Sequence, residues 1–122
     1  MTHQGPVKKV LIVDDSPLLQ TLVKDSLLRE DMDLSIGQAF NCKEAAELIA
    51  SFKPETLILD IGLPDGSGIE ILQKIKKDNH EIKVIMFTNF PSGEFKNDCM
   101  ELGADHFINK SDLTELIKII TR

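Results

Sequence analysis

Residues 56–60 read TLILD, a run of four apolar or β-branched residues that ends in an aspartate. Apolar and polar side chains do not alternate in this run, which is typical of a parallel strand covered by helices on both faces. Other apolar runs of strand length lie before and after it, each followed by an amphipathic stretch of helix length. This repeated alternation predicts a parallel α/β sheet with residues 56–60 as its central strand.

Five strand–helix units are expected along the chain. The predicted strands are Val7–Val13, Leu34–Phe40, Thr56–Asp60, Lys83–Phe87 and His106–Asn109. The predicted helices follow them at Pro17–Glu30, from Asn41 to just before Pro54, Ile69–Asp78, Ser92–Leu102, and from Ser111 or Asp112 onward.

Several residues indicate where these helices begin and end. Ser16 is expected to cap the first helix and Pro17 to open it. Asn41, with Glu44 three residues later, has the pattern of a capping box for the second helix. Gly103 can end the fourth helix in a left-handed conformation. The buried stripe of the first helix is expected to comprise Leu18, Leu19, Leu22, Val23 and Leu27.

The composition is that of one folded domain. The chain has 122 residues, of which 42% are hydrophobic and 28% charged, and it contains neither an apolar stretch long enough to cross a bilayer nor a secretory signal. A cytoplasmic location is therefore expected. Cys42 and Cys99 lie in predicted helices and are expected to be reduced. The net charge of −6 argues against sequence-independent nucleic-acid binding and favours proteins or a cation as partners.

Residues suited to phosphoryl chemistry stand at the carboxyl ends of four predicted strands. The residues are Asp14 and Asp15, Asp60, Thr88 and Lys110. Carboxyl ends of parallel strands lie at one edge of a sheet, so these side chains are expected to converge there. Adjacent residues on a strand point to opposite faces, but Ser16 and Pro17 indicate that the strand has ended before Asp14 and Asp15.

Three carboxylates at one place repel each other unless a cation compensates them. Oxygen ligands with open coordination positions suit Mg²⁺, with Mn²⁺ as a second candidate. Such a site favours a phosphoryl ligand, to which Thr88 could donate a hydrogen bond and Lys110 could offer positive charge. Asp60 ends the central strand and is the best-placed nucleophile.

Each of these residues also has an ordinary structural explanation. An acidic pair can be a solvated helix N-terminus, and Asp60 can be a turn residue. Thr88 can be a simple β-former and Lys110 a solvated charge. The four strand ends taken together favour a shared site over separate structural roles.

The motifs VLIVDDSP, LILDIGLPDGSGIEIL, VIMFT and LGADHFINK resemble the receiver domain of bacterial two-component response regulators, and the whole chain is similar to single-domain chemotaxis regulators. The resemblance implies one receiver domain over residues 1–122. It also implies a doubly wound, flavodoxin-like (βα)5 fold with strand order 2-1-3-4-5.

The same resemblance implies roles for particular residues. Asp60 would be the phosphoacceptor, and Asp14, Asp15, Asp60 and the backbone carbonyl of Gly62 would bind Mg²⁺. Thr88 and Lys110 would contact the phosphoryl group. Phe107 corresponds to the family's switch aromatic, whose rotation is coupled to movement of the threonine.

Two positions depart from the family pattern. Ser111 follows Lys110 where the family usually has a proline joined through a cis bond, so a trans bond is expected here. Asn89 follows Thr88 where a smaller residue is commoner, and it is expected to crowd or line the mouth of the site.

The implied function is that of a phosphorelay switch. The chain would take a phosphoryl group from a sensor histidine kinase, or from a histidine phosphotransfer protein, onto Asp60. It would then change the face formed by its last two strand–helix units, where a downstream protein binds. It would be a binding module with slight self-catalysis and not an enzyme, without direct contact to nucleic acid or membrane.

Two alternatives remain open at this point. The first is that the chain is the receiver segment of a longer DNA-binding transcription regulator. The second is a phosphatase of the haloacid-dehalogenase type, although its DxDx[TV] signature does not fit the residues from Asp14 to Ser16.

Overall fold

A computed structural model describes residues 8–78, 81–89 and 93–121 of the chain. Its main sheet has five parallel strands in the order β2-β1-β3-β6-β7. These strands are β1 (Lys9–Val13), β2 (Ser35–Ala39), β3 (Thr56–Leu59), β6 (Lys83–Thr88) and β7 (His106–Asn109). Counted along the chain, the order is 2-1-3-4-5, so the predicted fold is confirmed. The predicted start of the first strand, Val7, lies outside the described residues.

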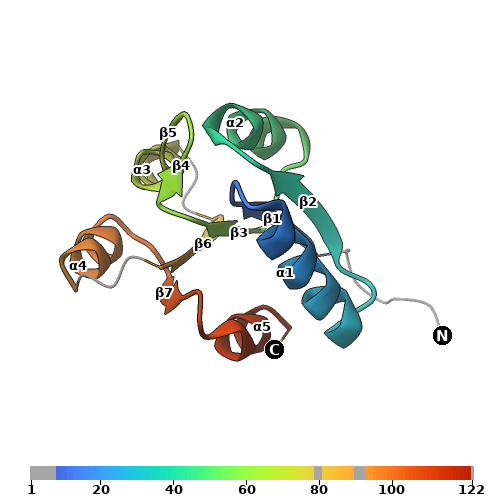
Figure 1. Cartoon of the computed structure of the whole chain (residues 1–122). Coiled ribbons are helices and arrows are strands. Elements are labelled where there is room, and N and C mark those ends of the chain that lie inside the picture. Colours follow the sequence, from blue (N-terminus) through green and yellow to red (C-terminus); the bar gives the residue numbers. More distant parts are fainter. Residues whose placement is uncertain (1–7, 79–80, 90–92, 122) are drawn as a thin grey trace.

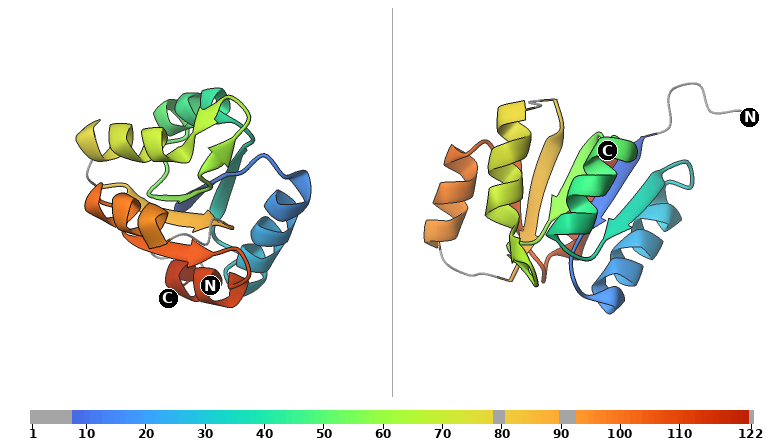
Figure 2. Two further views of the ribbon diagram at one scale, coloured as in Figure 1. Left: turned by 60° about the vertical axis from the view of Figure 1, so that its left-hand side comes forward. Right: turned by 90° about the horizontal axis from the view of Figure 1, so that it is seen from above.

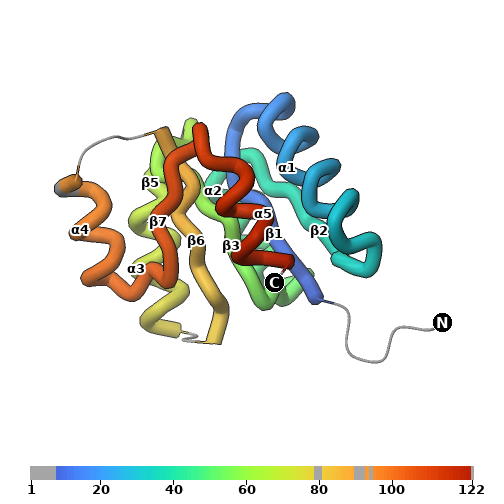
Figure 3. The backbone as a smooth tube through the Cα atoms, turned by 90° about the horizontal axis from the view of Figure 1, so that it is seen from below, coloured from blue at the N-terminus to red at the C-terminus, as the bar shows by residue number. Residues whose placement is uncertain are grey.

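Five helices cover the two faces of this sheet, as Figures 1 and 2 show. They are α1 (Pro17–Glu30), α2 (Cys42–Ser51), α3 (Gly68–Asp78), α4 (Gly93–Glu101) and α5 (Leu113–Thr121). Helices α1 and α5 lie side by side on one face (Figure 3). Helices α2, α3 and α4 lie on the other face. Ser92, the predicted start of the fourth helix, lies outside the described residues.

The central strand β3 contributes to both halves of the core. Leu57 and Leu59 pack with residues of α2, α3 and α4, whereas Ile58 packs with residues of α1 and α5. All four residues of β3 are buried. The unbroken apolar run in the sequence therefore reflects burial on both faces, as predicted.

The predicted helix caps are present. The Ser16 hydroxyl accepts a hydrogen bond from the Leu19 N–H at 3.2 Å. At α2, Asn41 Oδ1 accepts from the Glu44 N–H and Glu44 Oε1 accepts from the Phe40 N–H, both at 2.8 Å. Helix α5 begins after Asp112, whose Oδ1 accepts from the Glu115 N–H at 3.3 Å.

The end of α4 and the bond after the site lysine also agree with expectation. Gly103 follows α4 with φ of 104°, the left-handed conformation predicted for it. No cis peptide bond occurs among the described residues, so the bond between Lys110 and Ser111 is trans.

Two features of the sequence interpretation were wrong. Leu18 and Leu22 were placed on the buried stripe of α1, but they are 80% and 49% exposed. Gln20 is buried instead, because the helix turns that position toward the ends of β1 and β2. Between the predicted strand that ends at Asp60 and the predicted helix that starts at Ile69, where no strand was expected, the chain forms a short antiparallel pair, β4 (Gly62–Leu63) with β5 (Gly66–Ser67).

Candidate functional site

Three aspartates meet at the carboxyl edge of the sheet. Asp14 and Asp15 follow β1 directly, and Asp60 follows β3. One carboxylate oxygen from each residue lies within 4.8 Å of those of the other two. Asp14 and Asp60 are buried, at 2% and 7% exposure, whereas Asp15 is exposed to solvent. The predicted convergence of these carboxylates is therefore present in the structure.

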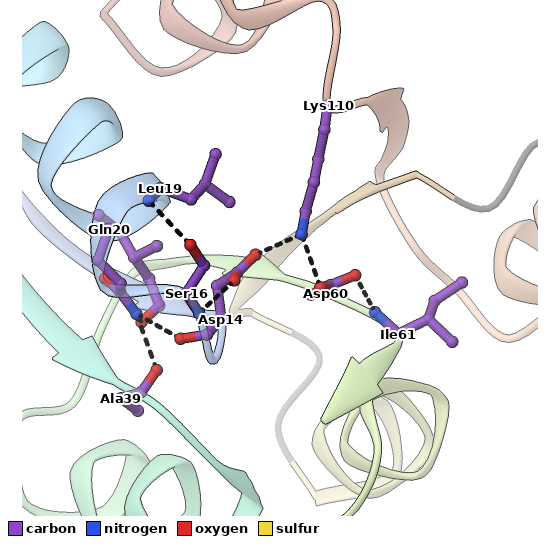
Figure 4. Close-up of polar contacts among 9 residues, drawn as sticks. Asp14, Ser16, Leu19, Gln20, Ala39, Asp60, Ile61 and Lys110 are labelled. Atoms are coloured by element: carbon purple, nitrogen blue, oxygen red, sulfur yellow. Dashed lines mark hydrogen bonds and ion pairs between the residues drawn. The ribbon is translucent and has the colours of Figure 1, made fainter. Parts of the chain in front are cut away.

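Lys110 reaches into this cluster from the end of β7 (Figure 4). Its Nζ lies 2.8 Å from Asp14 Oδ2 and 2.8 Å from Asp60 Oδ2. The backbone N–H of Lys110 donates to the Thr88 carbonyl at 3.1 Å, which ties the end of β7 to the end of β6. One ammonium group thus partly offsets the charge of two buried carboxylates.

The environment of the cluster shifts two ionisation equilibria. Burial raises the pKa of Asp14 above its usual 3.8, although hydrogen bonds from Lys110 and from the Ser16 N–H act in the opposite direction. Burial alone would lower the pKa of Lys110, but its hydrogen bonds and attraction to Asp14 and Asp60 prevail and raise this pKa above 10.5. Lys110 is therefore positively charged at neutral pH.

Backbone N–H groups orient both buried carboxylates. The Ser16 N–H donates to Asp14 Oδ1 at 2.9 Å, and the Ile61 N–H donates to Asp60 Oδ1 at 2.8 Å. In each carboxylate the second oxygen, Oδ2, contacts Lys110. The Oδ2 atoms of Asp14 and Asp60 consequently both contact the ammonium group of Lys110.

The loop after Asp60 is held against the site by close packing. The Gly68 N–H donates to the Ile61 carbonyl at 2.8 Å. A Cβ atom at Gly68 would overlap the carbonyl oxygen of Asp60. Only glycine allows α3 to begin this close to the backbone of Asp60. The sequence analysis did not identify this contact between Gly68 and Asp60.

The same loop is also attached to α2. Asp65 accepts hydrogen bonds from the N–H groups of Cys42 at 2.7 Å and Lys43 at 3.1 Å, the first residues of that helix. A carboxylate at a helix N-terminus satisfies N–H groups that have no partner within the helix. Asp65 therefore fixes the β4–β5 turn. Sequence reasoning did not identify this role, because Asp65 lies 23 positions from Cys42 and 22 positions from Lys43, and contacts between such distant residues leave no local pattern.

The remaining predicted site residues have different surroundings. Thr88 is fully buried at the end of β6, the strand that pairs with β3. Phe107 on β7 pairs with Met86 and packs, partly buried, against the core on the side of α2, α3 and α4. Gly62 and Asn89 are exposed. Thr88 and Asn89 thus lie at the same sheet edge as the aspartates, whereas the Phe107 ring belongs to the core.

The ligand atoms of the cluster suit a hard divalent cation. All three candidate side chains offer carboxylate oxygens, and the exposed position of Asp15 leaves one side of the cluster open to solvent. Ions such as Mg²⁺ prefer oxygen ligands and retain several waters. The residues present therefore fit a metal of this kind.

The doubly wound sheet, with an acidic cluster and a lysine at its carboxyl edge, defines an α/β domain of the receiver type. The chain belongs to the response regulator receiver domain family, whose profile matches residues 10–121.

Individual relatives agree with this assignment. The response regulator protein PilR of Pseudomonas aeruginosa is 35% identical over 114 residues, which cover 93% of this chain and 25% of PilR. The nitrate/nitrite response regulator protein NarL of Escherichia coli is 28% identical over 110 residues, covering 90% of this chain and 50% of NarL. A crystal structure of a CheY-like response regulator receiver domain protein from Methanospirillum hungatei matches with a TM-score of 0.83 and 32% identity, covering 95% of this chain and 94% of that one.

The chain spans between a quarter and about half of the length of these curated relatives, 25% of PilR and 50% of NarL. In the part of the chain that the structure describes, no helix has both the length and the apolar character needed to cross a bilayer.

Proposed function

We propose that this receiver domain is switched by phosphorylation of Asp60, with a sensor histidine kinase or a histidine phosphotransfer protein as the phosphoryl donor. The observation that carries the proposal is the arrangement of Asp60 beside Asp14, with Lys110 shared between them at 2.8 Å from each. This arrangement supplies a nucleophile, acidic ligands for a cation and a positive charge at one place.

In the proposed reaction, a carboxylate oxygen of Asp60 attacks the phosphorus atom of the donor's phosphohistidine. The oxygen–phosphorus bond forms as the phosphorus–nitrogen bond breaks, and the imidazole leaves with the electron pair and takes up a proton. The Ile61 N–H keeps Asp60 Oδ1 in place during this step. Lys110 is close enough to Asp60 to stabilise negative charge on the transferred oxygens.

Asp14, Asp15, Asp60 and the backbone carbonyl of Gly62 are the groups that we propose hold Mg²⁺, with Mn²⁺ as a substitute. When bound, the ion supplies positive charge against both the carboxylates and the phosphoryl oxygens. Thr88, at the end of β6, is proposed to donate a hydrogen bond to the phosphoryl group. Residues 1–122 would act together as one phosphoacceptor domain with slight self-catalysis and not as an enzyme.

The donor would approach the open side of the cluster. Asp15 is exposed there, and Leu18 and Leu22 on the following helix are 80% and 49% exposed. Exposed apolar side chains next to a reactive site favour contact with a protein partner.

The downstream protein is proposed to bind the face of the last two strand–helix units. A cytoplasmic location would bring the domain to kinases of this class.

A second candidate is that the domain controls an attached DNA-binding unit. The transcriptional regulatory protein YdfI of Bacillus subtilis, which is 30% identical and of which this chain covers 52%, favours this candidate. The mass of the protein isolated from its natural source shows whether any unit is attached to the 13.6 kDa of this chain, and binding of that isolated protein to DNA decides whether the unit is a DNA-binding one.

The proposed function is tested by incubating the protein with acetyl phosphate and measuring its intact mass. We expect a gain of about 80 Da, one phosphoryl group, with Mg²⁺ and none with EDTA. The absence of any gain in the presence of Mg²⁺, for a protein shown to be folded, would contradict the proposal.

A further inference from the structure

Gln20 is a buried polar residue next to the acidic cluster (Figure 4). It lies in the first turns of α1, and its side chain is 1% exposed. Its Nε2 donates to the carbonyls of Ile12 at 3.0 Å, Asp14 at 3.1 Å and Ala39 at 2.8 Å. The side chain therefore connects α1 to the ends of both β1 and β2.

These three acceptors determine how the amide is oriented. An amide nitrogen carries two hydrogens, so three acceptors require that at least one N–H be shared. The opposite orientation would place Oε1 against three carbonyl oxygens, which repel it. Gln20 Oε1 itself is buried and has no hydrogen-bond partner, and no other buried side-chain nitrogen or oxygen of the described residues lacks one. Leaving this acceptor unpaired costs stability.

The contacts of Gln20 stabilise the backbone of Asp14 in particular. Strand β2 ends at Ala39, and the chain turns there toward the α2 cap, Asn41. The Ala39 carbonyl accepts from both Gln20 Nε2 and the Asp14 N–H, the latter at 3.1 Å. Gln20 also donates to the carbonyl of Asp14 itself. The two peptide groups that flank the Asp14 side chain are thereby fixed in place, one by the Ala39 carbonyl and the other by Gln20.

We propose that Gln20 is a positioning residue for the metal and phosphoryl site. It fixes the backbone of Asp14, and so the carboxylate that lies beside Lys110 and Asp60, by donating to three strand-end carbonyls. An apolar side chain of similar size would fill the same space without an unpaired acceptor. It would, however, leave the Asp14 carbonyl without this donor. The inference rests on the proposed function, because it concerns the same site.

The test compares Mg²⁺ affinity in two folded variants by calorimetry. Gln20→Met removes the donor while keeping most of the volume, and we expect its dissociation constant for Mg²⁺ to rise at least about fivefold. Leu27→Ala is the matched control, because Leu27 is fully buried on the same helix but belongs to the core. We expect Leu27→Ala to lower the urea midpoint while its Mg²⁺ dissociation constant stays within about twofold of wild type.

Equal Mg²⁺ affinity of Gln20→Met and wild type would overturn the inference while leaving the proposed function standing. A loss of affinity in Leu27→Ala as large as in Gln20→Met would also overturn it, since general destabilisation would then explain both. Failure of the wild-type protein to bind Mg²⁺ would instead reject the proposed metal site, and the role of Gln20 with it.

A measurement on the wild-type protein keeps the inference testable if Gln20→Met does not fold. The side-chain NH₂ protons of Gln20 can be followed by NMR during a Mg²⁺ titration. We expect them to exchange slowly with solvent and to shift in step with Mg²⁺ binding. Rapid exchange, or resonances that stay constant while Mg²⁺ binds, would show that Gln20 is not coupled to the site.

Discussion

Lys110 lies between two buried carboxylates and provides the positive charge that a bound cation would otherwise supply. Its Nζ is 2.8 Å from an oxygen of Asp14 and 2.8 Å from an oxygen of Asp60. Lys110 and a divalent cation therefore compete for the same negative charge. The lysine lowers the repulsion among the aspartates in the metal-free protein, and we expect it to lower their affinity for the proposed Mg²⁺ as well.

This competition predicts opposite effects of Lys110→Met on two measurements. We expect Mg²⁺ to bind at least about threefold more tightly, because one nearby positive charge is removed. We expect the rate of phosphorylation by acetyl phosphate to fall, because the transferred oxygens lose a stabilising charge. Calorimetry and intact-mass kinetics measure the two effects.

Lys76→Met is the control for that prediction. Lys76 forms an ion pair with Asp105 at 3.0 Å, away from the acidic cluster. Its loss is expected to change neither Mg²⁺ affinity nor phosphorylation rate by more than about twofold. Weaker Mg²⁺ binding in Lys110→Met than in wild type would contradict the competition between lysine and metal.

At the scale of single elements, the start of α3 determines where the backbone of Asp60 lies. Gly68 opens this helix with its Cα against the Asp60 carbonyl. The Gly68→Ala variant is expected to lose about 1–3 kcal/mol in free energy of unfolding, because the added methyl group overlaps that oxygen. The Mg²⁺ affinity of the variant should fall as well, since Asp60 must move.

Gly93→Ala serves as the matched control. Gly93 opens α4, and an added Cβ there meets no atom within 4 Å. Its free energy of unfolding is expected to stay within about 0.5 kcal/mol of wild type. Urea denaturation of both variants measures the difference, and equal stabilities of Gly68→Ala and Gly93→Ala would show that the contact at Gly68 is unimportant.

The elements could be predicted from the sequence where their signals are local. Ser16, Asn41 and Gly103 have the roles at helix ends that their residue types indicated. The α1 stripe was predicted incorrectly because Leu18 and Leu22 are apolar but exposed, whereas the polar Gln20 is buried. Gln20 is buried because three strand-end carbonyls surround its amide, and such a site exists only once β1, β2 and α1 have assembled.

At the scale of the whole molecule, the order of the strands brings the acidic cluster and Lys110 to one edge. β1 and β3 are adjacent in the sheet, which places Asp14 next to Asp60 although they are 46 positions apart in the sequence. This convergence was predictable, because the carboxyl ends of parallel strands must share an edge. The pairing of Lys110 with both Asp14 and Asp60 was not, since it depends on side-chain conformations.

The whole-molecule prediction concerns the face formed by α4, β7 and α5. Phe107 on β7 pairs with Met86 and is partly buried, and Lys110 follows the end of the same strand. A phosphoryl group on Asp60 would attract Lys110 and Thr88, and movement at these strand ends would alter how Phe107 packs. We expect beryllofluoride, a phosphoryl mimic, to shift amide resonances across this face.

Asp60→Asn provides the control for this NMR experiment, because it should show no beryllofluoride-dependent shifts. The face needs a bias of only a few kcal/mol to move between two pre-existing conformations. Shifts confined to the loops around Asp14 and Asp60 would contradict the prediction and would place the output surface elsewhere.

The most direct test of the account identifies the residue that accepts the phosphoryl group. Wild type, Asp60→Asn and Asp65→Asn are each incubated with acetyl phosphate and Mg²⁺, and their intact masses are measured. Asp65 belongs to the same loop but caps α2, so it controls for changes in loop charge. We predict a gain of about 80 Da in wild type and Asp65→Asn and none in Asp60→Asn. A gain of about 80 Da in folded Asp60→Asn, equal to that of wild type, would contradict the assignment of Asp60 as the phosphoacceptor.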